Sequence, residues 1–175
     1  MSKNSKTRVA NADAELERLA IRVGRHLLAS GKRVATAESC TGGWISKVIT
    51  DIAGSSDWFA VGYVTYANET KEQLLGVPHK VLMLNGAVSR ATACAMARGA
   101  LTKSGVQIAV AVTGIAGPGG AVRGKPVGTV WLAWAFRHGR ATRIVAQLEH
   151  FRGNRNAVRR KTVRTALVGL LRVLG

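Results

Sequence analysis

The most constraining feature of the sequence is an apolar run over residues 107–112, which reads Gln-Ile-Ala-Val-Ala-Val. It has about the length of one β-strand, and it lacks the apolar–polar alternation of a strand with one face in water. Such near-continuous runs are typical of strands covered on both faces. We therefore expect this segment to be a central strand of a sheet in an α/β fold.

Helix and strand patterns alternate on both sides of this run. Helical spacing and end signals predict helices over residues 12–30, 44–52, 68–75, 90–104 and 154–174. Apolar, aromatic and β-branched runs predict strands over residues 33–38, 58–66, 128–136 and 141–149, with a hairpin turn at 137–140. Helices alternating with strands, together with one hairpin, predict a three-layer α/β/α sandwich with a mixed sheet.

The length of 175 residues fits one domain, which we expect over residues 13–175, after a flexible basic N-terminal arm over residues 1–12. No apolar stretch approaches the ~18 to 20 residues of a membrane span, and the N-terminus lacks the apolar core of a secretory signal. Cys40 and Cys94 are too few for a disulfide framework. We expect a cytoplasmic protein without a membrane partner. The scattered histidines predict no metal site.

The chain is strongly basic, with 26 Lys and Arg against 9 Asp and Glu, for a formal charge of +17. Residues 137–175 hold ten of the basic residues and one acid, Glu149. The favoured interpretation of this pattern is a solvated basic face. The second is electrostatic attraction of a small anionic substrate, and the least favoured is nucleic-acid binding. Aromatic residues make up only 5% of the chain, whereas single-stranded nucleic-acid sites commonly stack bases on aromatic rings.

The first candidate site is the segment Thr-Ala-Glu-Ser-Cys-Thr-Gly-Gly at residues 36–43. Ser39 lies where a predicted strand turns through glycines into a helix, so backbone N–H groups and the helix dipole could hold an oxyanion there. The alternative is that Ser39 only caps the helix and that Cys40 is a small packed residue. The segment is not a GxSxG elbow, which argues against a Ser-His-Asp triad.

The second candidate site is Tyr-Ala-Asn-Glu-Thr-Lys at residues 66–71. If Asn68 caps the helix, Lys71 lies in its first turn, where the dipole disfavours a cation by about 0.3 to 1 kcal/mol. Lys71 is then either an exposed lysine paired with Glu69 or Glu72, or a neutral amine that accepts a proton from a serine. The local sequence leaves both interpretations open.

The third candidate site is the glycine-rich loop that follows the apolar run, beginning Thr-Gly-Ile-Ala-Gly-Pro-Gly-Gly at residue 113. Open α/β sheets bind ligands at such strand ends, although the segment could also be a surface loop. Residues 119–125 match GxxxxGK, but Pro126 follows where a phosphate-binding loop needs Ser or Thr. A nucleoside-triphosphatase is therefore not expected.

Taken together, these segments resemble one known family. The stretches TAESCTGG, VTYANETKEQLLGV, GAVSRATACAMARGA, AVTGIAGPGG, KPVGTV and FRGNRNAVRRKTVRTAL are similar, in order and spacing, to the C-terminal domain of the competence-damage protein CinA. The resemblance to the stand-alone form of that domain implies a nicotinamide-nucleotide amidase. This activity converts nicotinamide mononucleotide to nicotinate mononucleotide and ammonia, without a cofactor or metal ion. We further expect a small anionic nucleotide as substrate and a homo-oligomer.

The resemblance also implies roles for individual residues. The nucleophile falls on Ser39, with Lys71 as its base and Tyr66 assisting. The resemblance also places Thr113 and Arg155 in the site. We expect backbone N–H groups near Thr41 and Gly42 to stabilise the oxyanion, and Thr113, Gly114 and Arg155 to bind the phosphate or ribose of the substrate. At three places the family commonly has an acidic residue and this chain does not. They are Arg90, Asn154 and the loop residues 118–120. The alternative is a non-catalytic nucleotide- or nucleic-acid-binding module of the same fold.

Overall fold

The computed structural model describes residues 3–175, with side chains from residue 11 onward. Its strands form one five-stranded mixed sheet in the order β2-β1-β3-β4-β5. β1 pairs in parallel with β2 and β3, whereas β4 is antiparallel to β3 and β5. The central position predicted for residues 107–112 is confirmed, because they form most of β3. The strand bounds are β1 (Val34–Glu38), β2 (Phe59–Val64), β3 (Ile108–Gly114), β4 (Thr129–His138) and β5 (Ala141–His150).

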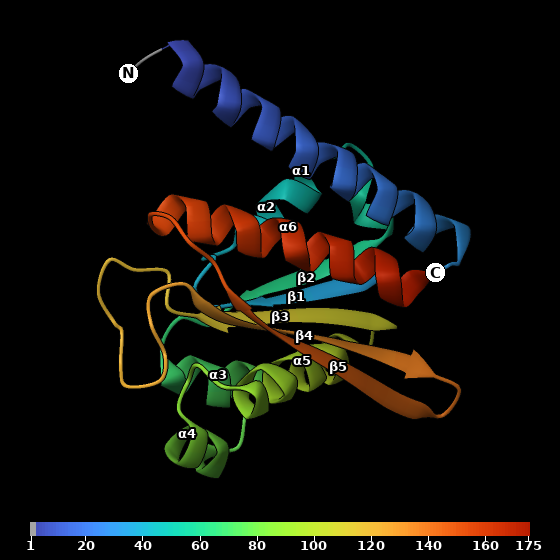
Figure 1. Ribbon diagram of the computed structural model, residues 1–175. Helices are drawn as coiled ribbons and strands as arrows, with labels where there is room; N and C mark the ends of the chain where they lie inside the picture. Colours follow the sequence, from blue (N-terminus) through green and yellow to red (C-terminus); the bar gives the residue numbers. More distant parts are fainter. Residues whose placement is uncertain (1–2) are drawn as a thin grey trace.

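Helices cover both faces of this sheet, which confirms the three-layer α/β/α arrangement (Figure 1). One side carries α1 (Lys3–Ala29), α2 (Trp44–Thr50) and α6 (Arg155–Leu174). The other side carries α3 (Asn68–Leu75), α4 (His79–Asn85) and α5 (Arg90–Ser104). A short 3₁₀ turn, η1 (Ser55–Asp57), precedes β2.

The helices differ from the sequence prediction in two places. α1 begins at Lys3 instead of near Ala12, so the described part of the segment expected to be a flexible arm is helical. Those residues lack an apolar pattern, but extending an existing helix costs much less than nucleating one. α4 was not predicted, because its seven residues between Pro78 and Gly86 are too few to show a clear helical period.

β3 divides the core into two unequal sides. Its larger side chains, at Ile108, Val110 and Val112, pack with the helices α1, α2 and α6. The alanines between them, Ala109 and Ala111, face the side of α5. Small residues on that face let α5 approach the sheet closely, since successive strand side chains point to opposite faces.

α5 also packs closely against α3. A Cβ added at Gly99 of α5 would lie 2.0 Å from the carbonyl oxygen of Leu75, the last residue of α3. Any larger residue at this position would push the two helices apart. Because α3 carries Lys71, this contact helps to set the position of that side chain.

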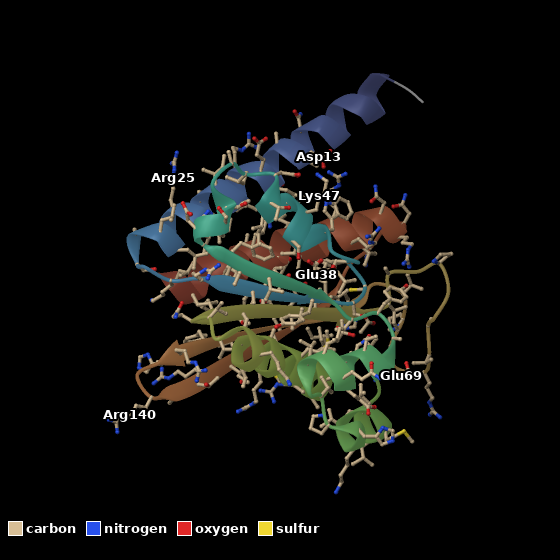
Figure 2. The ribbon with its side chains drawn as sticks, turned by 180° about the vertical axis from the view of Figure 1, so that it is seen from behind. Asp13, Arg25, Glu38, Lys47, Glu69 and Arg140 are labelled. Carbon is tan, nitrogen blue, oxygen red and sulfur yellow. The ribbon has the colours of Figure 1, made fainter. Side chains whose placement is uncertain are left out.

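Part of the basic C-terminal region is paired within the molecule. Arg160 and Arg164 of α6 form ion pairs with Asp13 and Glu15 of α1. By contrast, Arg140 lies at the tip of the β4–β5 hairpin, at the opposite end of the molecule from Glu69 of α3 (Figure 2). None of the helices in the described part of the chain combines the length and apolarity needed to cross a membrane.

Candidate active site

The turn after β1 places Ser39 at the carboxyl end of the sheet. The Ser39 N–H donates to the carbonyl oxygen of Val112 in β3, at 3.1 Å. Gly42 and Gly43 then take positive φ angles of 59° and 89° and direct the chain into α2. Gly43 is the N-cap of α2, and no side chain at that position caps the helix. The interpretation of Ser39 as a helix cap is therefore wrong.

Ser39 opens onto a cavity of about 210 Å³ at this end of the sheet. The cavity brings together six of the eight residues that the sequence indicated, from four separate segments of the chain. Its lining consists of Ser39, Cys40, Tyr66, Lys71, Ala87, Val88, Thr113, Gly114, Ala116 and Arg155. A hydroxyl, an amine and a guanidinium thus share one small space.

Thr41 and Gly42 do not line this cavity. Thr41 is fully buried, and its hydroxyl donates to Glu38 Oε2 at 2.7 Å. The Gly42 N–H donates to the carbonyl oxygen of Ser39 at 3.0 Å, and Gly42 itself lines a separate depression of about 610 Å³. Within the described residues, the N–H groups of Cys40 and Thr41 make no such bond to a neighbouring carbonyl or side chain. The glycine turn therefore carries Gly42 away from the cavity that Ser39 lines.

Lys71 is a buried residue, with only 1% of its surface exposed. Its Nζ donates to the carbonyl oxygens of Thr65 at 2.9 Å, Tyr66 at 3.0 Å and Ala67 at 3.4 Å. Burial lowers the pKa of Lys71 below its usual value, while the Glu69 carboxylate acts in the opposite direction. The interpretation of Lys71 as an exposed, ion-paired lysine is therefore wrong.

The start of α3 also differs from the prediction in one detail. Ala67, and not Asn68, is the N-cap residue, and its side chain makes no capping bond. The carbonyl oxygen of Ala67 is one of the three that surround the Lys71 amine. The short turn before α3 therefore holds the amine from several sides.

Ser39 Oγ and Lys71 Nζ line the same cavity, although within the described residues no hydrogen bond joins them. Hydrogen bonds between catalytic groups are often long in the absence of substrate and tighten when it binds. Three carbonyl groups hold the lysine, so its amine is the better fixed of the two groups.

Arg155 reaches the mouth of the cavity from the first residue of α6. Its Nη1 donates to the carbonyl oxygen of Gly117 at 2.9 Å, and its Nη2 donates to the Tyr66 hydroxyl at 3.2 Å. The Tyr66 side chain is exposed, so its phenol belongs to the cavity mouth, while its backbone carbonyl contacts Lys71. Deeper in the cavity, the Thr113 hydroxyl donates to the carbonyl oxygen of Ala87 at 2.8 Å.

Cys40 is buried beside Ser39, with 5% of its surface exposed. Burial raises the pKa of the Cys40 thiol to about 12. The thiol is therefore protonated at neutral pH, whereas the thiolate is the nucleophilic form of cysteine. In the part of the chain that the structure describes, His, Cys, Asp and Glu side chains form no group of three or more suited to a metal ion.

Glu38, the last residue of β1, was not among the residues predicted from the sequence. Its carboxylate is fully buried beneath the turn that carries Ser39, and it accepts hydrogen bonds from that turn and from α2. The available signal was an acid at the end of the short strand Val-Ala-Thr-Ala-Glu, since an ionised carboxylate is rarely buried without hydrogen-bond partners.

The model of the CinA C-terminal domain family matches residues 16–174 of the chain. The chain belongs to this family. The match confirms the resemblance inferred from the sequence segments, and it includes every residue that lines the 210 Å³ cavity. The CinA C-terminal domain is thus the unit that contains the candidate active site.

Individual members of the CinA C-terminal domain family match most of the chain. The nicotinamide-nucleotide amidohydrolase PncC of Escherichia coli K12 is 51% identical over 155 residues, which are 89% of this chain and 92% of the relative. The Pseudomonas putida protein of the same name is 52% identical over 89% of this chain and 94% of its own length. The crystal structure of the competence/damage inducible protein CihA from Agrobacterium tumefaciens has a TM-score of 0.88 and 45% identity, and the match covers 92% of this chain and 96% of CihA.

Proposed function

We propose that this protein is a nicotinamide-nucleotide amidase, which converts nicotinamide mononucleotide and water to nicotinate mononucleotide and ammonia. The observation that carries the proposal is the meeting of Ser39, Lys71 and Arg155 in one cavity of a CinA C-terminal domain. These groups supply a nucleophile, a buried amine and a cation for the phosphate. Relatives named for this activity match nearly their full length, which supports the same assignment here.

In the proposed first step, Ser39 Oγ attacks the carboxamide carbon while its proton passes to the neutral amine of Lys71. The carbonyl oxygen becomes an oxyanion, which backbone N–H groups of the turn that carries Ser39 stabilise. Lys71 then returns the proton to the amide nitrogen as the C–N bond breaks. Ammonia leaves, and an ester joins the nicotinate group to Ser39.

In the proposed second step, water attacks this ester and gives a proton to Lys71. The ester bond breaks, and Ser39 Oγ regains a proton from Lys71. The carboxylic acid that forms loses its proton to solvent and is released as the carboxylate. Tyr66 assists through two different atoms. Its carbonyl oxygen holds the Lys71 amine, and its phenol oxygen accepts a hydrogen bond from Arg155.

The cavity of about 210 Å³ is smaller than the roughly 300 to 1,000 Å³ of sites that enclose drug-sized ligands. We therefore place the pyridine carboxamide inside it, against Thr113 and Gly114, and the ribose and phosphate at its mouth. Arg155 lies at that mouth, and a guanidinium can bind two phosphate oxygens at once.

The first test of this function is release of ammonia from nicotinamide mononucleotide by the purified, folded protein in the presence of EDTA. We expect release that is linear in enzyme and equimolar with nicotinate mononucleotide. No release above background at ample substrate would contradict the amidase assignment and favour a non-catalytic nucleotide- or nucleic-acid-binding module. Release that EDTA abolishes would contradict the proposed metal-independent reaction.

Arg155→Ala should raise KM for nicotinamide mononucleotide by about 10- to 100-fold, because a charged hydrogen-bonding partner of the phosphate is lost. The KM for nicotinamide riboside, which has no phosphate, should change by less than about threefold. Steady-state kinetics on both substrates measures the difference.

Arg152→Ala is the matched control, because it removes a nearby exposed positive charge that does not line the cavity. We expect it to leave both KM values close to wild type. An equal effect of Arg155→Ala on the nucleotide and the riboside would remove Arg155 from the phosphate site. An equal effect of both arginine variants on the nucleotide would indicate long-range attraction instead of direct contact.

A further inference from the structure

Glu38 has a fully buried carboxylate in which both oxygens accept hydrogen bonds. Oε2 accepts from Thr41 Oγ1 at 2.7 Å and from the Ile45 N–H at 2.9 Å. Oε1 accepts from the N–H and the hydroxyl of Ser46, both at 2.8 Å. Figure 2 shows Glu38 in the interior, between α2 and the strands of the sheet. One side chain thus connects β1, the Ser39 turn and the first turn of α2.

No lysine or arginine among the described residues forms an ion pair with this carboxylate. Its stabilisation comes from N–H and hydroxyl donors and from the positive end of the α2 dipole. Burying an ionised group in this way is costly unless its hydrogen bonds are complete. A Ser, Thr, Asp or Asn at the N-cap position could cap α2 without a long buried carboxylate. Capping alone therefore does not account for a glutamate next to Ser39.

Thr41 is held from two directions. Its hydroxyl donates to Glu38, and its carbonyl oxygen accepts a hydrogen bond from Arg159 of α6. The other end of the turn is fixed by the bond from the Ser39 N–H to Val112. The segment between these attachments carries the nucleophilic hydroxyl.

We infer that Glu38 is a positioning residue, which fixes the Ser39 hydroxyl relative to the Lys71 amine. The inference rests on the proposed amidase function. Glu38 does not line the cavity and transfers no proton to the substrate. Lys71 is held by a different segment, the carbonyl groups of residues 65–67, so a displaced Ser39 turn would separate nucleophile from base.

Glu38→Gln tests this arrangement with a change of only one acceptor oxygen to NH₂. The hydroxyls of Thr41 and Ser46 can rotate to accept from an amide NH₂, but the backbone N–H groups of Ile45 and Ser46 cannot. One N–H at the start of α2 therefore loses its acceptor and the turn shifts. We expect kcat to fall about 100-fold, as for a misplacement of about 1 Å, with KM within about threefold of wild type.

Thr41→Val and Thr41→Ser provide a second test that keeps the Glu38 carboxylate. The valine has no hydroxyl for Glu38, so we expect kcat to fall about tenfold with little change in KM. The serine restores the hydroxyl and should recover most of that loss. A rise in KM at unchanged kcat in Thr41→Val would instead show that Thr41 binds substrate, which would overturn the positioning role.

The reactivity of Ser39 toward phenylmethanesulfonyl fluoride gives a readout that does not depend on the natural substrate. Mass spectrometry of the intact protein follows the rate of sulfonylation. We expect Glu38→Gln to slow labelling of Ser39 by at least about tenfold. The control is Ile49→Ala, which weakens the buried side of α2 without touching the Glu38 hydrogen bonds, and which should lower Tm but preserve the labelling rate.

These outcomes separate the two proposals. Wild-type protein that is labelled at Ser39 but releases no ammonia would contradict the proposed substrate, while the Glu38→Gln labelling rate would still test positioning. Wild-type labelling rate and kcat in Glu38→Gln would overturn the role of Glu38. Equal slowing in Glu38→Gln and Ile49→Ala at matched loss of Tm would also overturn it, because the effect would then be one of stability alone.

Discussion

Ser39→Ala lowers kcat for amide hydrolysis by at least about 1,000-fold, with normal folding, if Ser39 forms the acyl-enzyme. Alanine removes only the hydroxyl of a side chain that lines the cavity. The turn and its bond to Val112 involve backbone atoms and should be unchanged. Ammonia release under saturating substrate measures the effect, and circular dichroism and Tm report the folded state.

The neighbouring thiol provides the control for this prediction. Cys40→Ala should keep at least about half of the wild-type kcat, because burial raises the thiol pKa to about 12 and suppresses its reactivity. Comparable losses in the two variants would contradict the assignment of Ser39 as sole nucleophile. Substantial activity in Ser39→Ala would show that water attacks the carboxamide directly, with Lys71 as its base.

Lys71→Arg also lowers kcat by at least about 1,000-fold, because guanidinium does not deprotonate usefully near neutral pH. The cavity around Nζ is moreover built for a single nitrogen, with carbonyl oxygens of Thr65, Tyr66 and Ala67 at 2.9 to 3.4 Å. Lys71→Ala would leave the buried carbonyl of Thr65 without its donor, at a cost of about 1 to 3 kcal/mol in stability. Chemical denaturation measures that cost separately from activity.

The pH profile shows whether the amine acts as a base. A neutral amine has two N–H bonds, so it can keep the shorter contacts to Thr65 and Tyr66 and release the longest, to Ala67. Only this form can accept the Ser39 proton. The value of kcat/KM should therefore rise about tenfold per pH unit below the Lys71 pKa and level off above it.

Burial lowers the Lys71 pKa from its ordinary value of 10.5, so the plateau should begin below that pH. The carbonyl acceptors favour the ammonium form and limit the size of this shift. A rate independent of pH, or near wild-type activity in Lys71→Arg, would show that Lys71 supplies only positive charge. The Ser39 proton would then need another acceptor, for which the Tyr66 phenol is the next candidate.

The sequence by itself determined the order of elements and the central strand. The small and large side chains that alternate along residues 107–112 allow helices to pack on both faces, and this pattern is local to the strand. The cap of α5 was equally local, since Ser89 accepts from the N–H of Thr92 three residues later. Resemblance to the CinA C-terminal domain indicated Ser39, Lys71 and Arg155, which the fold brings to one cavity.

Only the tertiary structure decided how these residues are held. Arg155 contacts Gly117 and Tyr66, which lie 38 and 89 residues away in the sequence. The carbonyl groups of residues 65–67 surround the Lys71 amine, and α5 approaches α3 closely at Gly99, a contact between helices that neither helix sequence reveals. Glu38 accepts hydrogen bonds from N–H groups of α2, but it lies at the end of β1 and not at the N-cap position, where a capping side chain is usually found. Local sequence patterns encode burial and backbone preference, whereas hydrogen-bond partners far apart in the chain are set by packing.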